Sequence, residues 1–339
     1  MILIYFDIFS GVKIGIIEIM ELLETTGFND YELLDSGDGY RLERFGKFIL
    51  SRPDPQIIWK KRLSTDIWNQ ADAIFQRTFQ DKGNWIKKNK NLPDKWQLSY
   101  KDLKFWIKLT PFKHTGIFPE QHLMWDFISS QISDASSQIK NNQASGIQTA
   151  KSKTEEINSD NQKLITDNRI NILNLFAYTG IASLAAASAG AKVTHVDASK
   201  PAISWARENQ NISQLDKKPI RWILDDATKF VTREIKRGIK YDGIIMDPPI
   251  FGHGPDGILW KFNDNFPKLL ALCKQILSDQ PLFIIINAYA ISSSSLMLKN
   301  VMEDYFSDLG GQFEVGELVL KESKNQRPLS TGIFGKWSV

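Results

Sequence analysis

The sequence predicts an α/β protein whose C-terminal half forms a seven-stranded, mainly parallel sheet with helices on both faces. Short runs rich in Ile, Leu and Val recur between residues 169 and 339, and amphipathic helical patterns separate most of them. Parallel neighbours need a crossover connection, so this alternation covers the sheet with helices on both sides. The last two strands have no helix between them, which predicts a closing hairpin.

The elements follow in a regular order. The predicted strands span 169–176, 191–197, 219–226, 241–247, 281–288, 311–323 and 329–339. The predicted helices span 180–190, 199–211, 227–238, 265–278 and 294–310. Gly190 is a typical helix terminator, and Ser199 with Pro201 is typical of a first helical turn. Asn325 to Pro328 is the expected turn of the hairpin.

Length and composition bound the class of protein. A chain of 339 residues favours two domains, and 42% hydrophobic residues with ten Trp and twenty Phe exclude a wholly disordered chain. The single cysteine, Cys273, excludes an intrachain disulfide scaffold and a structural Cys-zinc fold. We therefore expect a reducing cytoplasm and no metal. A net charge of only +3 gives no overall sign of a nucleic-acid partner.

Two segments are expected to lie outside the domain cores. Residues 1–20 are apolar, but three charges interrupt them and no basic leader precedes them. We favour an upstream extension with Met20 as an alternative start, then an extra strand or helix, and last a signal or anchor, so no stable membrane partner is expected. Residues 134–168 are rich in Ser, Asn, Gln and Lys and have no aromatic residue, which predicts a flexible polar insert.

A lysine-rich block lies between residues 82 and 113. Its nine lysines and two acidic residues give it a local charge of +7, and aromatic residues are interleaved with them. Cations mixed with aromatic rings are typical of single-stranded nucleic-acid binding. Half-buried strands with solvated lysines would produce the same pattern. We favour strands for the aromatic residues and an RNA-binding surface for the lysines.

Acidic residues end three of the predicted parallel strands. Ligands of such sheets bind beyond the carboxyl ends of the strands, where Asp197, Asp225 with Asp226, and Asp247 lie. A single Asp at a strand end is ordinarily a helix cap, but three ends in register favour a binding site. The first strand leads into NLFAYTG (174–180), which lacks the G-x-G-x-x-G pattern, so NAD and FAD are disfavoured.

These motifs resemble the class I S-adenosylmethionine-dependent methyltransferases, in particular the group similar to the large-subunit ribosomal RNA methyltransferases. The resemblance rests on 112–121, 174–180, 196–199, 225–227, 247–252, 316–323 and 327–337. It implies a Rossmann-like methyltransferase sheet and, from 31–59, a small β-rich N-terminal domain. The expected division is an N-terminal extension (1–20), a β-rich domain (21–113), a cofactor-covering helix region (114–133), the polar insert (134–168) and the methyltransferase domain (169–339).

The resemblance also implies a site for S-adenosylmethionine. Thr179 and Gly180 would approach its methionine part, Asp197 the ribose hydroxyls and Asp226 the adenine amino group. The full set of implied cofactor residues is Thr115, Phe118, Gln121, Phe176, Tyr178, Thr179, Gly180, Asp197, Asp225, Asp226 and Ala227. For Thr115, Phe118 and Gln121, a plain junction between domains explains the sequence as well.

The segment DPPIFG (247–252) is the expected catalytic motif. Asp247 and the carbonyl of Pro248 would accept hydrogen bonds from an amino or ring nitrogen, Pro249 stiffens the turn, and Phe251 would stack on a base. The expected substrate-binding residues are Phe251, His253, Lys101, Lys104, Lys108 and Lys113. Three glycines in 252–257 suggest a mobile lid.

Methylation at C5 of a pyrimidine requires a cysteine nucleophile. Cys273 lies among leucines of a predicted helix, where a buried, inert thiol is expected. The expected reaction is therefore nitrogen methylation of a base in ribosomal RNA, with hydroxyl methylation less favoured. Two alternatives remain: a methyltransferase acting on a protein side chain or small amine, and a non-catalytic RNA-binding protein on the same fold.

Overall fold

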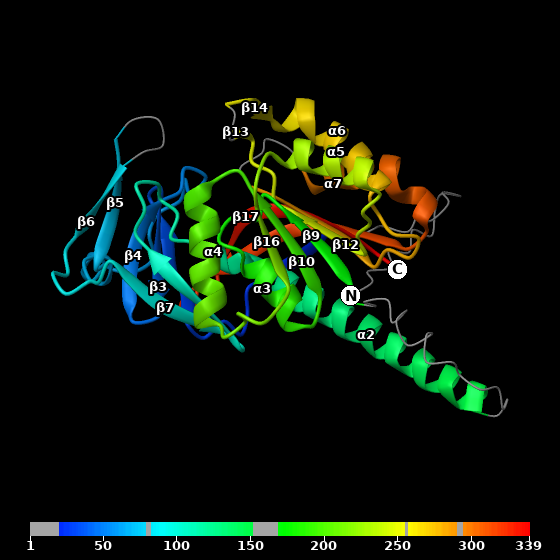
Figure 1. Cartoon of the computed structure of the whole chain (residues 1–339). Helices are drawn as coiled ribbons and strands as arrows, with labels where there is room; N and C mark the ends of the chain where they lie inside the picture. Colours follow the sequence, from blue (N-terminus) through cyan, green and yellow to red (C-terminus); the bar gives the residue numbers. More distant parts are fainter. Residues whose placement is uncertain (1–19, 79–82, 152–168, 255–256, 290–293) are drawn as a thin grey trace, which may run out of the picture.

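An eight-stranded, mostly parallel sheet dominates the computed structural model, which describes residues 20–78, 83–151, 169–254, 257–289 and 294–339 (Figure 1). Its strand order is β1-β16-β17-β15-β12-β9-β10-β11, and β17 runs antiparallel to both of its neighbours. The sheet strands are β1 (Glu21–Glu24), β9 (Asn171–Leu175), β10 (Lys192–Asp197), β11 (Ile220–Leu224), β12 (Gly243–Met246), β15 (Phe283–Ala288), β16 (Gln312–Lys321) and β17 (Pro328–Ser338). The predicted fold class and the closing hairpin of β16 and β17 are confirmed.

Helices cover both faces of the sheet. They are α2 (His122–Lys151), α3 (Ile181–Ser188), α4 (Lys200–Ile212), α5 (Ala227–Arg237), α6 (Phe262–Gln275) and α7 (Ser295–Phe306). Successive strand residues point to opposite faces, so Leu173 and Leu175 of β9 pack with α5, α6 and α7, whereas Ile172 packs with α2 and α3. Strands β12 and β15 are buried along their whole length, as expected for central parallel strands.

Strand β1 extends the sheet beyond the seven strands that the sequence predicts. Residues 21–24, expected in the N-terminal domain, instead pair in parallel with Gly316–Val319 of β16. Leu23 packs on the sheet core, and Thr25 N donates to the carbonyl of Val319 at 2.8 Å. Four residues carry too little periodicity to be recognised as a strand. The rest of the predicted extension, residues 1–19, lies outside the described residues.

Helix α2 corrects the prediction of a flexible polar insert over 134–168. The helix runs to Lys151, with Ile132 buried and Ile139 partly buried against the core beneath α3. Once this packed segment has nucleated the helix, each further residue adds a hydrogen bond at little cost, so the polar residues continue it. The far end of α2 projects from the body (Figure 1). Residues 152–168 lie outside the described part of the chain.

The segment expected to be a mobile lid forms a small hairpin. Strands β13 (Phe251–His253) and β14 (Leu259–Lys261) pair in antiparallel fashion. Trp260 anchors the hairpin because its Nε1 donates to the carbonyl of Pro249 at 2.7 Å and its ring packs 4.9 Å from that of Phe176. Three-residue strands with glycines give no alternating pattern, so the sequence did not predict them.

No helix in the described ranges has the length and apolarity to cross a membrane.

The N-terminal part consists of two smaller sheets. One contains β2 (Tyr31–Gly37), β3 (Tyr40–Phe45), β4 (Phe48–Pro53), β5 (Ala73–Arg77) and β6 (Gly83–Lys87), and the other is the hairpin of β7 (Lys95–Tyr100) and β8 (Leu103–Lys108). The short helix α1 (Thr65–Trp68) lies between β4 and β5. In β7 and β8 the inward residues Trp96, Tyr100 and Phe105 are buried, whereas Lys95 and Lys104 are exposed, as is Lys101 in the turn between the two strands. The strand interpretation of the interleaved aromatics is confirmed for these three.

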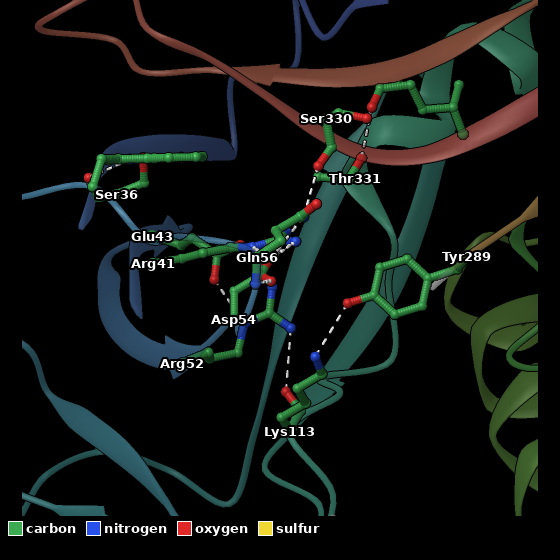
Figure 2. A network of polar contacts seen from close by, with 12 residues as sticks. Ser36, Arg41, Glu43, Arg52, Asp54, Gln56, Lys113, Tyr289, Ser330 and Thr331 are labelled. Carbon is green, nitrogen blue, oxygen red and sulfur yellow. Dashed lines mark hydrogen bonds and ion pairs between the residues drawn. The ribbon is translucent and has the colours of Figure 1, made fainter. Parts of the chain in front are cut away.

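Two buried ion pairs join β3 to β4 and to Asp54, the residue that directly follows β4 (Figure 2). Arg41 pairs with Asp54, and Arg52 binds Glu43 in bidentate fashion at 2.7 and 2.6 Å. Burial alone would raise the pKa of Glu43, but Arg52 and Arg41 hold it below its usual range. Arg52 also donates to the carbonyl of Lys113 at 3.2 Å, so the network reaches the segment that leads into α2.

We predict that Arg52→Met destabilises the protein by about 3–5 kcal/mol, because it leaves the Glu43 carboxylate buried without its partner. Urea unfolding followed by near-UV circular dichroism measures this loss. Asp94→Asn, which removes the exposed pair with Lys87 in the same domain, is the control and should leave the unfolding midpoint unchanged. Equal midpoints for both variants would contradict the prediction.

Candidate active site

The carboxyl ends of β9, β10, β11 and β12 surround a cavity of about 660 Å³. Strands β10 and β12 both pair with β9 in parallel register, so the residues that follow these strands lie at one edge of the sheet. Thirteen residues that the sequence predicts for the site line this cavity: Phe118, Gln121, Phe176, Tyr178, Asp197, Asp225, Asp226, Ala227, Asp247, Pro248, Pro249, Phe251 and His253. The cavity is therefore the candidate active site.

The turn after β9 is built around Asp197. Phe176 and Tyr178 have positive φ values of 53° and 49°, and this irregular backbone points the amide of Tyr178 at β10. Tyr178 N donates to Oδ2 of Asp197 at 2.8 Å, and Ser199 N donates to Oδ1 at 2.8 Å. Burial raises the pKa of Asp197 despite these two bonds. Since a carboxylate has about four lone-pair sites, each oxygen keeps acceptor capacity for a ligand.

The acidic pair after β11 has a structural role as well as a place in the cavity wall. Asp226 caps α5, since its Oδ1 accepts from Lys229 N at 2.9 Å, and Asp225 pairs with Arg233. Asp226 is therefore a helix cap, which is the ordinary role of a single Asp at the end of a strand. The second carboxylate oxygen of Asp226, Oδ2, lies 3.3 Å from the position that a Cβ atom on Gly254 would occupy. Because Gly254 directly follows β13, this end of the β13–β14 hairpin lies against the carboxylate.

Asp247 directly follows β12 and faces Gln121. Gln121 Nε2 donates to Oδ2 of Asp247 at 2.7 Å. Burial raises the pKa of Asp247 to about 6, although the bond from Gln121 opposes this shift. A carboxyl group with this pKa exchanges a proton near neutral pH, which suits a general base.

Asn287 lies beside Asp247, because Met246 and Ile286 are partners in the parallel pair of β12 and β15. Its side chain is 4% exposed, lines the cavity, and its Oδ1 has no hydrogen-bond partner among the described residues. Such an orphaned acceptor is costly unless a ligand satisfies it. Sequence reasoning missed Asn287; its place at the end of a buried strand beside that of Asp247 was the available signal.

The segment between β8 and α2 forms the opposite wall. The ring of Phe118 lies 5.8 Å from that of Tyr178, and Thr179 Oγ1 donates to the carbonyl of Gly116 at 2.6 Å. Thr115 is fully buried and does not line the main cavity. Thr179 and Gly180 instead line a small adjoining cavity of about 50 Å³, together with Phe118, Gln121, Asp247 and Asn287.

Most of the predicted substrate lysines lie away from the cavity. Lys101 pairs with Asp126 at 2.6 Å and Lys108 with Glu208 at 2.9 Å, and neither these residues nor Lys104 line the site. Acidic residues from other elements thus neutralise part of the local +7 charge, which a count within the block could not reveal. Lys113 is different, because its Nζ donates to the hydroxyl of Tyr289 at 3.1 Å, at the rim.

Several lining residues were not predicted. They are His114, Glu120, Trp260, Asn287, Tyr289, Leu318, Thr331 and Gly332, with the flanking Val196, Ala198, Ser199, Ile250, Gly252, Gly254 and Ala288. Burial lowers the pKa of His114 to about 3, and the neighbouring positive charge of Arg52 acts in the same direction, so the imidazole is neutral.

Among the described residues no cluster of His, Cys, Asp or Glu is arranged to hold a metal ion.

Comparison with known proteins identifies the class of this site. A family model described as "Conserved hypothetical protein 95" matches residues 160–254. A crystal structure of the SAM-dependent methyltransferase from Agrobacterium tumefaciens is 37% identical and superposes with a TM-score of 0.82, covering 95% of this chain and 94% of that one. The chain belongs to the SAM-dependent methyltransferases, as the sequence motifs predict.

More specific relatives share part of the chain. The "Ribosomal RNA large subunit methyltransferase I" of Pseudoalteromonas translucida is 31% identical over 162 residues, which is 46% of this chain and 38% of the relative. The protein of the same name from Salmonella arizonae is 36% identical over 104 residues, 30% of this chain and 23% of the relative. The chain thus spans less than half the length of these curated relatives.

We predict that Gly116→Ala disturbs the wall of the site. Gly116 has a φ of 99°, and a Cβ there would lie 2.1 Å from the ring of Trp205, so the chain before Phe118 must shift. Gly190→Ala is the matched control, because its φ is also positive (107°) but nothing lies within 4 Å of its Cβ. Thermal unfolding should show a larger loss for Gly116→Ala than for the control; equal losses would mean that backbone strain alone matters.

Proposed function

We propose that the protein transfers the methyl group of S-adenosylmethionine to an amino nitrogen of a base in ribosomal RNA. The observation that carries this proposal is the pair of hydrogen-bond acceptors, Asp247 and Asn287, side by side in the cavity of a SAM-dependent methyltransferase fold. Ribosomal RNA as the substrate class is supported by the partial similarity to the rRNA large subunit methyltransferases.

The residues present fit the cofactor. The cavity of about 660 Å³ is in the size range of ligand sites, and apolar and aromatic side chains line it together with eleven polar or charged ones, five of which are carboxylates. Asp197 would accept the ribose hydroxyls, Asp226 would face the adenine amino group, and Phe176 and Ala227 would bound the base. Thr179 and Gly180 would border the methionine part. When bound, S-adenosylmethionine supplies an activated methyl group on a sulfonium.

Two acceptors on one wall suit an exocyclic amino group, which carries two N–H donors. Gln121 occupies Oδ2 of Asp247, and we assign Oδ1 of Asp247 and Oδ1 of Asn287 to the two N–H groups of the substrate. The carbonyl of Pro248 is a further acceptor at this turn. Phe251 is 66% exposed at the cavity mouth and therefore has a ring face available for stacking on the target base.

The reaction then needs only alignment and one proton transfer. The nitrogen lone pair forms the new N–C bond as the C–S bond of the sulfonium breaks, and that bonding pair stays on sulfur. Asp247 accepts the proton that the nitrogen loses and passes it to solvent. The products are the methylated amine, S-adenosylhomocysteine and one proton, so charge and atoms balance without a covalent enzyme intermediate.

A cysteine-dependent route lacks its nucleophile. Cys273 is fully buried in α6 within the core beneath β12 and β15, and burial raises the pKa of its thiol. A neutral, enclosed thiol is a poor nucleophile. Cys273 does not line the cavity, and this agrees with transfer to nitrogen rather than to C5 of a pyrimidine.

One observation favours the alternative substrate class, a protein side chain or small amine. Three of the lysines on this face are paired with carboxylates, so the face offers less free positive charge than the sequence suggests. The pairs are Lys87 with Asp94, Lys95 with Glu208, and Lys101 in the β7–β8 turn with Asp126. Both substrate classes use the same two acceptors for an amino group. Only an acceptor assay separates them.

The first test follows the label. Methyl-labelled S-adenosylmethionine is incubated with ribosomal RNA and, separately, with protein extract, and label should enter the RNA. Asp247→Ala should lower incorporation at least about hundredfold, the scale of a lost general base, yet retain cofactor binding in calorimetry. Asp197→Ala should lose cofactor binding itself. Label that appears only in protein would overturn the RNA assignment.

The second test uses pH. Because the carboxylate form of Asp247 accepts the proton and its pKa is about 6, kcat/KM should fall as the pH drops below about 6. Gln121→Ala removes a bond that favours the carboxylate, so the acid limb should move to higher pH. An unshifted limb in this variant would show that another group controls the profile.

A further inference from the structure

A second groove opens beside the active site, between the N-terminal sheets and the C-terminal hairpin. Its volume is about 640 Å³, close to that of the catalytic cavity. The two hollows meet, because five residues line both: His114, Ala288, Tyr289, Thr331 and Gly332. The groove is thus an extension of the active site toward the N-terminal domain, and nothing in the proposed chemistry uses it.

The cationic side of the groove comes from Arg77 and from the turn that carries Lys113. This turn is held in place, since Trp85 Nε1 donates to the carbonyl of Thr110 at 2.8 Å and Gly83 N to that of Pro111 at 3.1 Å. The Arg52 guanidinium also holds this turn, because it donates to the backbone carbonyl oxygen of Lys113. Lys113 therefore projects from a rigid backbone, with its Nζ at the Tyr289 hydroxyl (Figure 2).

The polar wall of the groove is organised by the buried ion pairs. Asp54 lines the groove but directs its carboxylate to Arg41, and its side chain is only 3% exposed. Gln56 bridges the domains, because its Nε2 donates to the carbonyl of Ser330 in β17 at 2.7 Å (Figure 2). Glu317 of β16 is the other acidic residue of the lining. The lining thus carries two cations and two carboxylates, one of which is paired with Arg41, and this balance suits a single phosphate rather than a long duplex.

An exposed aromatic ring completes the set. Phe112 lines the groove and is 50% exposed, directly before Lys113 in the chain. The Thr110 hydroxyl, 2.7 Å from the carbonyl oxygens of both Phe112 and His114, stabilises the turn that presents this ring. A flat ring beside a cation is the combination that binds an unpaired nucleotide, through stacking on the base and attraction of the phosphate.

We infer that this groove binds the single-stranded nucleotide next to the target base, with Phe112 stacking on its base and Lys113 holding its phosphate. The inference rests on the proposed function, because it takes the substrate to be RNA. It adds a binding site outside the catalytic cavity and predicts that the substrate is unpaired on at least one side of the modified base.

The experiment measures RNA binding and RNA methylation separately. Anisotropy of a short fluorescein-labelled single-stranded RNA, with S-adenosylhomocysteine present, gives Kd at several salt concentrations. Labelled ribosomal RNA gives KM and kcat. The variants are Lys113→Gln and Phe112→Ala, and Lys113→Arg retains the charge. Lys217→Gln, an exposed lysine between α4 and β11 that does not line the groove, is the charge-matched control.

We expect Phe112→Ala to raise Kd and KM at least about fivefold, the scale of one lost stacking contact. Lys113→Gln should reduce the salt slope of log K by about 0.7, as for one phosphate contact with a single strand. Neither variant should change kcat or cofactor binding by more than about twofold. Lys113→Arg should restore most of the affinity, and Lys217→Gln should match the unmodified protein.

The outcomes separate the two proposals. If the unmodified protein methylates RNA but both groove variants keep its Kd and KM, the groove assignment is wrong and the proposed function stands. If RNA takes up no label, while Lys113→Gln and Phe112→Ala still weaken RNA binding, the groove stands and the proposed reaction is wrong. A kcat loss in Lys113→Gln without any change in KM would also overturn the groove, since it would place Lys113 in the chemistry.

Discussion

The parallel register of β9, β10, β12 and β15 is the constraint on which the site depends. Parallel neighbours in register end at the same edge, so residues far apart in the chain, such as Asp197, Asp247 and Asn287, meet around one cavity. Packing against α5, α6 and α7 on one face and α2 and α3 on the other fixes this register, because a slip by one residue would exchange the two faces. The helices thus determine where the acceptors lie.

The N-terminal sheets complete what the large sheet leaves open. The strands supply one wall only, and Phe118 and Gln121 close the other from a segment that begins at β8. The buried pairs of Arg41 with Asp54 and Arg52 with Glu43 stiffen the sheet that holds this segment. Buried charges add little net stability over a well-packed apolar core, but their geometry is specific. Here Arg52, held by Glu43, fixes the backbone of Lys113 and so the rim of the site.

Much of this arrangement could be predicted from the sequence. The strand and helix order of 169–339 follows from local periodicity, and the acids after β10, β11 and β12 follow from topology. The sequence alone did not reveal β1, whose four residues owe their conformation to pairing with β16, or the helical state of residues 134–151, which depends on packing of the preceding turns. It also missed Asn287, because an amide in an apolar strand gives no periodic signal. The charge partners of Lys101 and Lys108 are tertiary and were equally invisible.

The distribution of polar groups also explains why we propose that the chemistry takes place at β12 and β15 rather than at the Asp pair after β11. Asp225 and Asp226 are engaged by Arg233 and by the first turn of α5, which holds them as fixed acceptors. Among the residues that the structure describes, Asp247 has only the neutral Gln121 as a side-chain hydrogen-bond partner, so burial is not offset by a cation and its pKa is raised to about 6. An acid paired with Arg cannot readily accept a proton, whereas one that faces an amide can. In the proposed reaction, positioning and proton transfer therefore fall to different carboxylates along one edge of the sheet.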